Sequence, residues 1–234
     1  MRSSVNESPI NPLPPVVWLL IAPLVISEIA FGLAQTGLIG GAQGIGLRQA
    51  VLERTAFAPE FILRAVMTGD WGNAQLWRLL TYPFIHISPM QAVFVAVFTL
   101  ALGKMVAEQF RPAAVLALFF GSAIGGALIY TAVNVLIGVR FGPLMGGFPA
   151  VYGLVGAFTF LLWLRLGYEN ANQFRAFTLI GVLLTFQLVF GIVFGGAGYG
   201  WIAEVAGFAV GFLLSFVLIP GGLARTLRHI RDRT

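Results

Sequence analysis

The sequence predicts an all-α integral membrane protein with six transmembrane helices. Of its 234 residues, 58% are hydrophobic and only 10% are charged, and the mean hydropathy is +0.89, whereas soluble domains carry about 25% charged residues. Apolar stretches long enough to cross a bilayer recur six times along the chain. So much apolar surface also excludes a disordered chain, because such a chain could not remain solvated.

The six predicted spans follow one another with short connections, except after the first. Residues 1–14 form a polar tail, and the apolar stretch of residues 15–34 is about 20 residues long, which crosses roughly 30 Å. It is too long for the core of a cleaved signal peptide, so we interpret it as a transmembrane helix. The membrane domain continues to residue 219 and is followed by a basic tail, residues 220–234. Its other predicted spans cover roughly residues 85–103, 112–139, 145–164, 176–198 and 201–219.

The long first connection covers about residues 35–80. It is too polar to span a bilayer, but apolar residues recur at helical spacing, which predicts short helices lying in the membrane interface. Trp77 and Arg78 are expected to anchor the bundle at a lipid–water boundary. With six spans, both termini share one side, and that side collects most of the Lys and Arg residues. The positive-inside rule therefore predicts cytoplasmic termini and an extracytoplasmic first loop.

Small residues at four-residue spacing mark the fourth and sixth predicted spans. Gly153 belongs to such a row in the fourth span, and Gly207 and Gly211 form one in the sixth. Small side chains let two helix backbones approach closely in lipid, where hydrophobic burial does not drive helix association. We therefore expect these two spans to be neighbours.

Four segments with recognisable motifs lie in order within residues 76–218. Residues 77–86 read WRLLTYPFIH, Leu102 and Gly103 are followed by Glu108, residues 146–153 read GGFPAVYG, and residues 204–211 read EVAGFAVG. Together they resemble the rhomboid family of intramembrane serine proteases. The third segment is similar to that family's Gly-x-Ser-Gly-Ala-x-Tyr-Gly, and the fourth to its His-x-x-Gly-x-x-x-Gly. The resemblance implies a six-helix rhomboid-like bundle whose long first loop leads into the second helix.

The positions that carry the family's chemistry hold other residues in this sequence. Phe148 stands at the position of the nucleophilic serine, Glu204 at that of the histidine base, and Gln91 and Val95 at the positions that help hold the oxyanion; only the flanking Tyr152 is retained. A phenyl ring has no lone pair that can attack a carbonyl. Valine offers no donor where negative charge develops. The resemblance therefore implies a pseudoprotease without a catalytic Ser/His dyad, and its pocket is expected to be lined by Phe148, Tyr152, Glu204 and Gln91.

Few other residues in the sequence could supply a nucleophile, a base or a metal site in place of the missing groups. The chain has no cysteine, and its two histidines, His86 and His229, lack metal-binding spacing, so we expect no metal and no cofactor. We predict no pairing of a histidine with any serine within the spans, which are Ser27, Ser88, Ser122 and Ser215.

Two carboxyl groups, Glu28 and Glu204, lie inside predicted spans, where ionisable residues are candidates for function. We expect each to be protonated and hydrogen-bonded to a neighbour, with Tyr152 or Gln91 as the candidate partner of Glu204. The alternative is a carboxyl pair that performs acid–base hydrolysis, as in aspartyl proteases, which requires the two groups to lie about 3 Å apart.

The leading hypothesis is a catalytically inactive rhomboid-like protein that binds transmembrane helices of client membrane proteins and no nucleic acid. The alternative is an active intramembrane endopeptidase, serine-type by family, with relocated or carboxylate-based chemistry. A small transporter is a third possibility, but the sequence has no evident repeat symmetry. We expect a multi-pass protein of the bacterial inner membrane.

Overall fold

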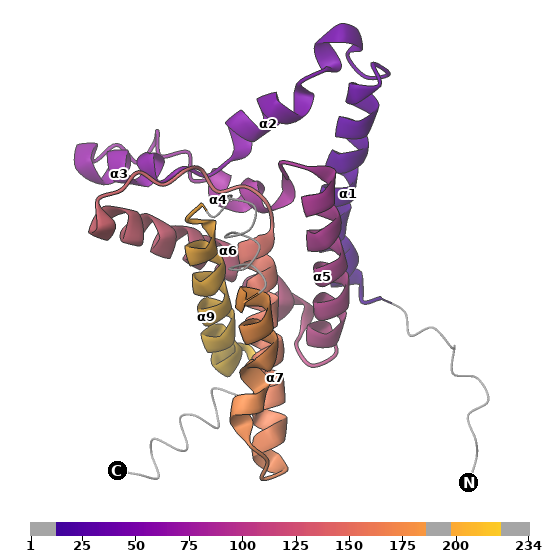
Figure 1. Ribbon diagram of the computed structural model, residues 1–234, viewed down its shortest axis with the longest axis vertical. Coiled ribbons are helices and arrows are strands. Elements are labelled where there is room, and N and C mark those ends of the chain that lie inside the picture. Colours follow the sequence, from indigo (N-terminus) through magenta and orange to yellow (C-terminus); the bar gives the residue numbers. More distant parts are fainter. Residues whose placement is uncertain (1–12, 186–197, 221–234) are drawn as a thin grey trace, which may run out of the picture.

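The computed structural model describes residues 13–185 and 198–220, and these fold into a bundle of helices (Figure 1). Within this part of the chain, five helices are long and apolar enough to cross a membrane. They are α1 (Pro15–Gln35), α5 (Pro89–Ala107), α6 (Pro112–Ile137), α7 (Phe148–Tyr168) and α9 (Gly200–Leu218).

These five helices correspond to predicted spans one, two, three, four and six. The predicted fifth span, residues 176–198, is only partly described: an apolar helix covers Gln173–Thr185, beginning with the 3-10 turn η3 (Gln173–Phe177), and residues 186–197 lie outside the described part. The tails at residues 1–12 and 221–234 also lie outside it. The structure therefore supports an all-helical membrane bundle with at least five spans.

Proline marks the beginning of four of the five helices. Pro15, Pro89 and Pro112 are the first residues of α1, α5 and α6, and Pro149 is the second residue of α7. A proline costs little in the first turn, where its missing N–H would have no helical partner.

Two helices begin a few residues after the approximate starts of the predicted spans. The second span begins at Pro89 rather than residue 85, because the side chain of Ser88 accepts a hydrogen bond from the Gln91 N–H at 3.3 Å and caps the helix there. The fourth begins at Phe148 rather than residue 145, after the Gly146–Gly147 turn, and it continues to Tyr168.

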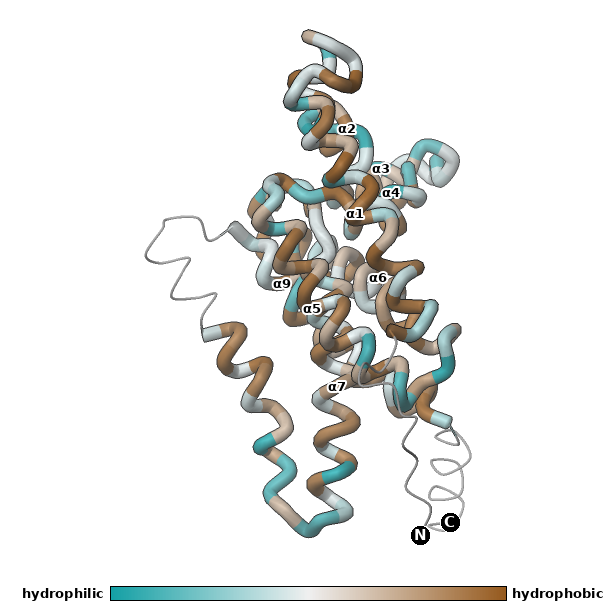
Figure 2. Tube along the Cα trace, turned by 90° about the vertical axis from the view of Figure 1, so that its right-hand side faces the viewer, coloured by the Kyte–Doolittle hydropathy of each residue, from teal (hydrophilic) through white to brown (hydrophobic). Residues whose placement is uncertain are grey.

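Helix α7 lies at the centre of the bundle. It contacts α5, α6 and α9, whereas α1 packs mainly against α5 (Figure 1). Of the most apolar stretch of α7, 56% is buried inside the protein, compared with 33% for α1 and α5. Figure 2 shows that apolar residues follow the helices, whereas polar residues gather in connections such as the turn after α7.

The most extensive helix contact joins α7 to α9, the spans that the small-residue rows predict to be neighbours. A Cβ added at Gly207 would overlap the carbonyl oxygen of Pro149, and one added at Gly211 would lie 2.6 Å from the Gly153 Cα. Backbone therefore lies directly against backbone, at a distance that only glycine permits.

The first loop contains several short helices: η1 (Gly41–Gly44), α2 (Leu47–Thr55), α3 (Pro59–Thr68), α4 (Arg78–Thr81) and η2 (Tyr82–Phe84). Arg78 of α4 contacts α2 and α3. Its guanidinium donates hydrogen bonds to the carbonyl oxygens of Glu53 and Ala56 at 2.9 and 2.8 Å, and it stacks on the ring of Phe61. In the structure, Arg78 therefore holds the end of α2 against the beginning of α4.

Candidate functional site

The site predicted from the sequence lies at the beginning of α7, where a tight glycine turn enters the helix. Gly146 has a φ of +87°, in the left-handed region that favours glycine. Its N–H donates to the Tyr82 carbonyl oxygen at 2.9 Å, and the N–H of Gly147 donates to Nε2 of His86 at 3.2 Å. These bonds hold the turn before α7 against η2 and the segment that leads from η2 to α5.

His86 is fully buried at this turn. Because Nε2 accepts the bond from Gly147, we assign the proton of the neutral ring to Nδ1. Burial lowers the pKa of His86 to about 4, and the opposing charges of Glu28 and Arg48 modify it in smaller measure. Nδ1 makes no hydrogen bond within the described residues. The imidazole is therefore a neutral structural acceptor near neutral pH.

Gln91 and Val95 reach the same turn from α5. A Cβ added at Gly146 would lie 2.8 Å from Nε2 of Gln91, and one added at Gly147 would lie 2.7 Å from Cγ1 of Val95. The Oε1 of Gln91 accepts a hydrogen bond from the Ile87 N–H at 3.0 Å. The two residues at the family's oxyanion positions therefore pack directly against the glycine turn.

Phe148, Tyr152 and Glu204 complete the site. Phe148 is the first residue of α7, half-buried against the hydrophobic core, and Tyr152 lies buried one turn later. Glu204 of α9 is buried and close enough to interact electrostatically with Tyr152. Glu204 precedes Gly207 by one turn, and Gly207 packs on Pro149. The structure thus brings residues of α5, α7 and α9 to one end of α7.

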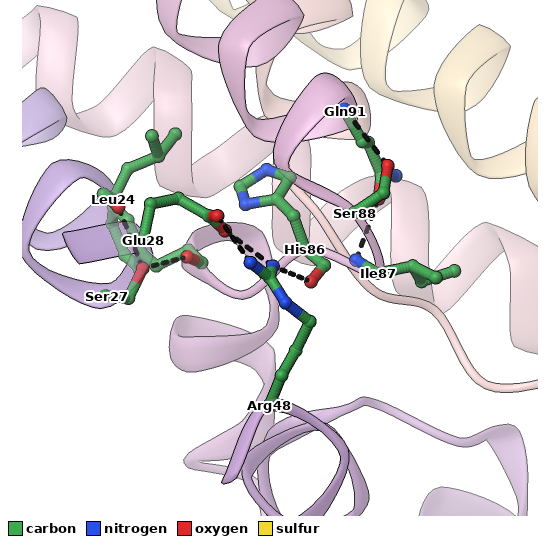
Figure 3. Close-up of polar contacts among 9 residues, drawn as sticks. Leu24, Ser27, Glu28, Arg48, His86, Ile87, Ser88 and Gln91 are labelled. Carbon is green, nitrogen blue, oxygen red and sulfur yellow. Dashed lines mark hydrogen bonds and ion pairs between the residues drawn. The ribbon is translucent and has the colours of Figure 1, made fainter. Parts of the chain in front are cut away.

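Glu28 has the hydrogen-bonded neighbour that we expected, and this neighbour lies in the first loop. Both of its carboxylate oxygens accept hydrogen bonds from Arg48 of the first loop, at 2.8 and 2.7 Å (Figure 3). Its hydrogen-bonding neighbour is thus the guanidinium of a loop arginine, which binds a carboxyl group through two parallel hydrogen bonds. It also occupies both oxygens, so Glu28 does not form the shared-proton carboxyl pair with Glu204 that acid–base hydrolysis requires.

The serines of the described spans do not pair with His86. Ser27 donates to the carbonyl oxygens of Leu24 and Phe84, Ser88 caps α5, and Ser215 donates to the Gly211 carbonyl oxygen. Ser122 is buried, and a Cβ added at Gly153 would overlap its side chain. His229 lies outside the described residues, and the described part of the chain holds no group of three side chains suited to a metal ion.

Sequence reasoning missed two members of this arrangement. From the sequence, His86 is considered only as a possible base or metal ligand, although it lies in the motif-bearing segment of residues 77–86. Its role as an acceptor for the turn before α7 has no sequence signature. Arg48 enters the sequence analysis only as one of the basic residues counted for topology, not as a partner of Glu28. It follows Glu28 by 20 positions, with a loop between them, and no regular spacing connects the two.

The fold and the site together define a polytopic helical membrane protein whose centre is the glycine turn before α7. Comparison with known proteins identifies its family: the Rhomboid domain matches residues 73–221, and the chain belongs to the rhomboid family. The chain is also 26% identical over 194 residues to Rhomboid-like protease 3 of Toxoplasma gondii, an alignment that covers 82% of this chain and 66% of that protein. It therefore spans slightly less than two thirds of that relative.

Proposed function

We propose that this chain is a non-catalytic member of the rhomboid family that binds transmembrane helices of other membrane proteins without cleaving them. The observation that carries the proposal is the side chain of Phe148. It occupies the first position of α7, where the resemblance of this sequence to the rhomboid family implies a nucleophile. A phenyl ring cannot attack a peptide carbonyl.

The groups around Phe148 support the loss of chemistry. The Gly147 N–H is already donated to His86, Pro149 has no N–H, and Val95 presents only methyl groups to the turn. Removing one oxyanion donor alone costs roughly 3–4 kcal/mol of transition-state stabilisation in acyl transfer. Several losses in one place leave little basis for peptide hydrolysis.

The retained packing supports a binding role. The glycine contacts between α7 and α9 and the turn against α5 keep the bundle compact around a partly buried aromatic ring. A family scaffold that presents an apolar side chain at its pocket can contact an apolar helix through packing alone. We infer that client helices approach the region lined by Phe148, Tyr152, Gln91 and Glu204.

Labelling with a serine-directed fluorophosphonate tests the absence of catalysis. We expect no labelling of the purified protein in detergent, while a soluble serine hydrolase added to the same sample reacts fully. Labelling of the chain that is abolished by mutating a single serine would overturn the proposal.

Photocrosslinking tests the binding role. A photoreactive residue at Phe148 should give discrete adducts with membrane proteins. The same residue at Leu213, an exposed position of α9, serves as the control and should react mainly with lipid. Identical adduct patterns at the two positions would contradict client binding at the site.

The alternative of an active endopeptidase rests on Glu204, which is a buried carboxyl group beside Tyr152 at the family's base position. Glu204→Gln separates the two functions. If the chain is an enzyme that uses this carboxyl group, the substitution should abolish cleavage of a membrane-anchored reporter. If the chain is not an enzyme, the substitution should change nothing in this assay.

For topology, we infer six spans, cytoplasmic termini, an extracytoplasmic first loop and residence in the bacterial inner membrane. The chain has no cysteine, so single introduced cysteines can be probed without a background. Asn73→Cys in the first loop and Asn170→Cys in the turn after α7 occupy exposed positions. We expect an impermeant maleimide to label intact cells at the first and not at the second, and the reverse result would invert the topology.

A further inference from the structure

Helix α2 of the first loop has few apolar contacts of its own. Leu52 is the one residue that it buries among its nine. Two arginines hold its ends: Arg78 binds the carbonyl oxygens of Glu53 and Ala56 near its C-terminus, and Arg48, near its N-terminus, reaches α1. The position of α2 therefore depends on polar contacts more than on apolar burial.

Arg48 makes three kinds of contact at once. Its two terminal nitrogens bind Glu28 of α1, and Nη1 also donates to the backbone carbonyl oxygen of His86 at 2.9 Å (Figure 3). Its guanidinium lies 4.7 Å from the centre of the Phe31 ring. The side chains of Arg48 and Glu28 are only 12% and 17% exposed, so the pair is largely shielded from water.

We propose that Arg48 is a positioning residue that latches α2 onto α1 and, through His86, sets the position of Phe148 at the beginning of α7. The path is continuous. The guanidinium holds the carbonyl of His86, the imidazole of His86 holds the N–H of Gly147, and Gly147 directly precedes Phe148. A movement of the first loop is thereby coupled to the site.

The geometry of the guanidinium group explains why arginine is suited to this position. The planar guanidinium can bind both carboxylate oxygens and still direct another N–H to a carbonyl, whereas the lysine ammonium acts as a point charge. Removal of Arg48 would leave the Glu28 carboxylate shielded from water without its counter-charge, which is unfavourable. Any ligand or chain segment that competes for Glu28 would therefore release α2. In its effect on clients, this inference rests on the proposed binding function.

Two measurements, neither of which requires a client protein, test whether Arg48 holds α2 and positions Phe148. One is the distance distribution between spin labels at Ala50 of α2 and Leu136 of α6, both exposed positions. The other is the ¹⁹F signal of a trifluoromethyl-phenylalanine placed at Phe148. With Arg48→Gln, we expect the single narrow distance to be lost and the ¹⁹F signal to shift.

Two further variants make the test specific. Arg54→Gln changes an exposed arginine of the same helix and should leave both readouts unchanged. The exchange of Glu28→Arg with Arg48→Glu restores the ion pair, but a glutamate cannot donate to the His86 carbonyl. We expect this exchange to recover the distance and not the ¹⁹F signal.

The latch is overturned if Arg48→Gln behaves like Arg54→Gln, or if α2 moves while the ¹⁹F signal stays unchanged. Either result leaves the proposed function intact, because no client is present in these experiments. Conversely, if a photoreactive residue at Phe148 gives no client adducts while Arg48 and Glu28 are unchanged, the proposed function is contradicted. The positioning role of Arg48 is not affected by that result.

Discussion

Adding one methyl group at Gly211 is expected to destabilise the contact between α7 and α9. A Cβ at this position would lie 2.6 Å from the Gly153 Cα and 2.7 Å from its carbonyl carbon. Carbon atoms in ordinary contact are about 3.5–4.0 Å apart, so the two helices would have to separate locally by about 1 Å. Overpacking costs about 1–3 kcal/mol. We expect a value in the upper part of this range, because helix backbone cannot rotate away as a side chain can.

Gly32 of α1 provides the matched control. A Cβ there would meet nothing within 4 Å, and replacing glycine by alanine in a helix gains up to about 1 kcal/mol. The measurement is unfolding by SDS in mixed micelles, followed by tryptophan fluorescence. Gly211→Ala should unfold at lower SDS than the unmodified protein, and Gly32→Ala at the same or higher SDS. Equal midpoints for the two variants would refute the argument from backbone contact.

Two further predictions concern the loop and its contacts with the site. Because burial lowers the pKa of His86 from 6.5 to about 4, the unfolded chain binds a proton between these values that the folded chain does not. Stability should therefore be complete above about pH 6.5 and fall by up to about 3 kcal/mol as the pH drops to 4. His86→Gln should flatten this part of the pH profile of thermal unfolding, and unchanged profiles would contradict the assignment. Arg78→Ala removes the bonds to the end of α2 and should accelerate limited proteolysis within the first loop. Arg64→Ala, which changes an exposed residue of α3, should not.

Much of the helical framework could be predicted from the sequence, because the features that define it are local. Span length and hydropathy identify five helices that the structure describes, and prolines mark where several of them begin. The small-residue rows place α7 beside α9 because four-residue spacing keeps Gly207 and Gly211 on one face of the helix. The beginning of α5 was placed about four residues early because Ile85 and Ile87 are apolar, although the backbone of residues 85–88 forms a connection.

The polar contacts of the site could not be predicted in the same way, because they join segments distant in the sequence. Glu28 stands as a lone carboxyl in an apolar stretch that itself contains no basic partner. Only the folding of α2 back onto α1 brings Arg48 to it. The bond between His86 and Gly147 likewise connects residues 61 positions apart. Which loop residue reaches which span depends on tertiary packing, which the spacing of residues does not encode.

The central location of α7 constrains how the protein can be made. This helix leaves the ribosome after α5 and α6 but before α9, whose glycines fit against it. Until α9 arrives, the face of α7 that carries Gly153 must lie against lipid or a chaperone. Final consolidation of the contact between α7 and α9 therefore waits for α9 to be synthesised, and truncation before α9 should yield inserted but loosely packed helices that quality-control proteases remove.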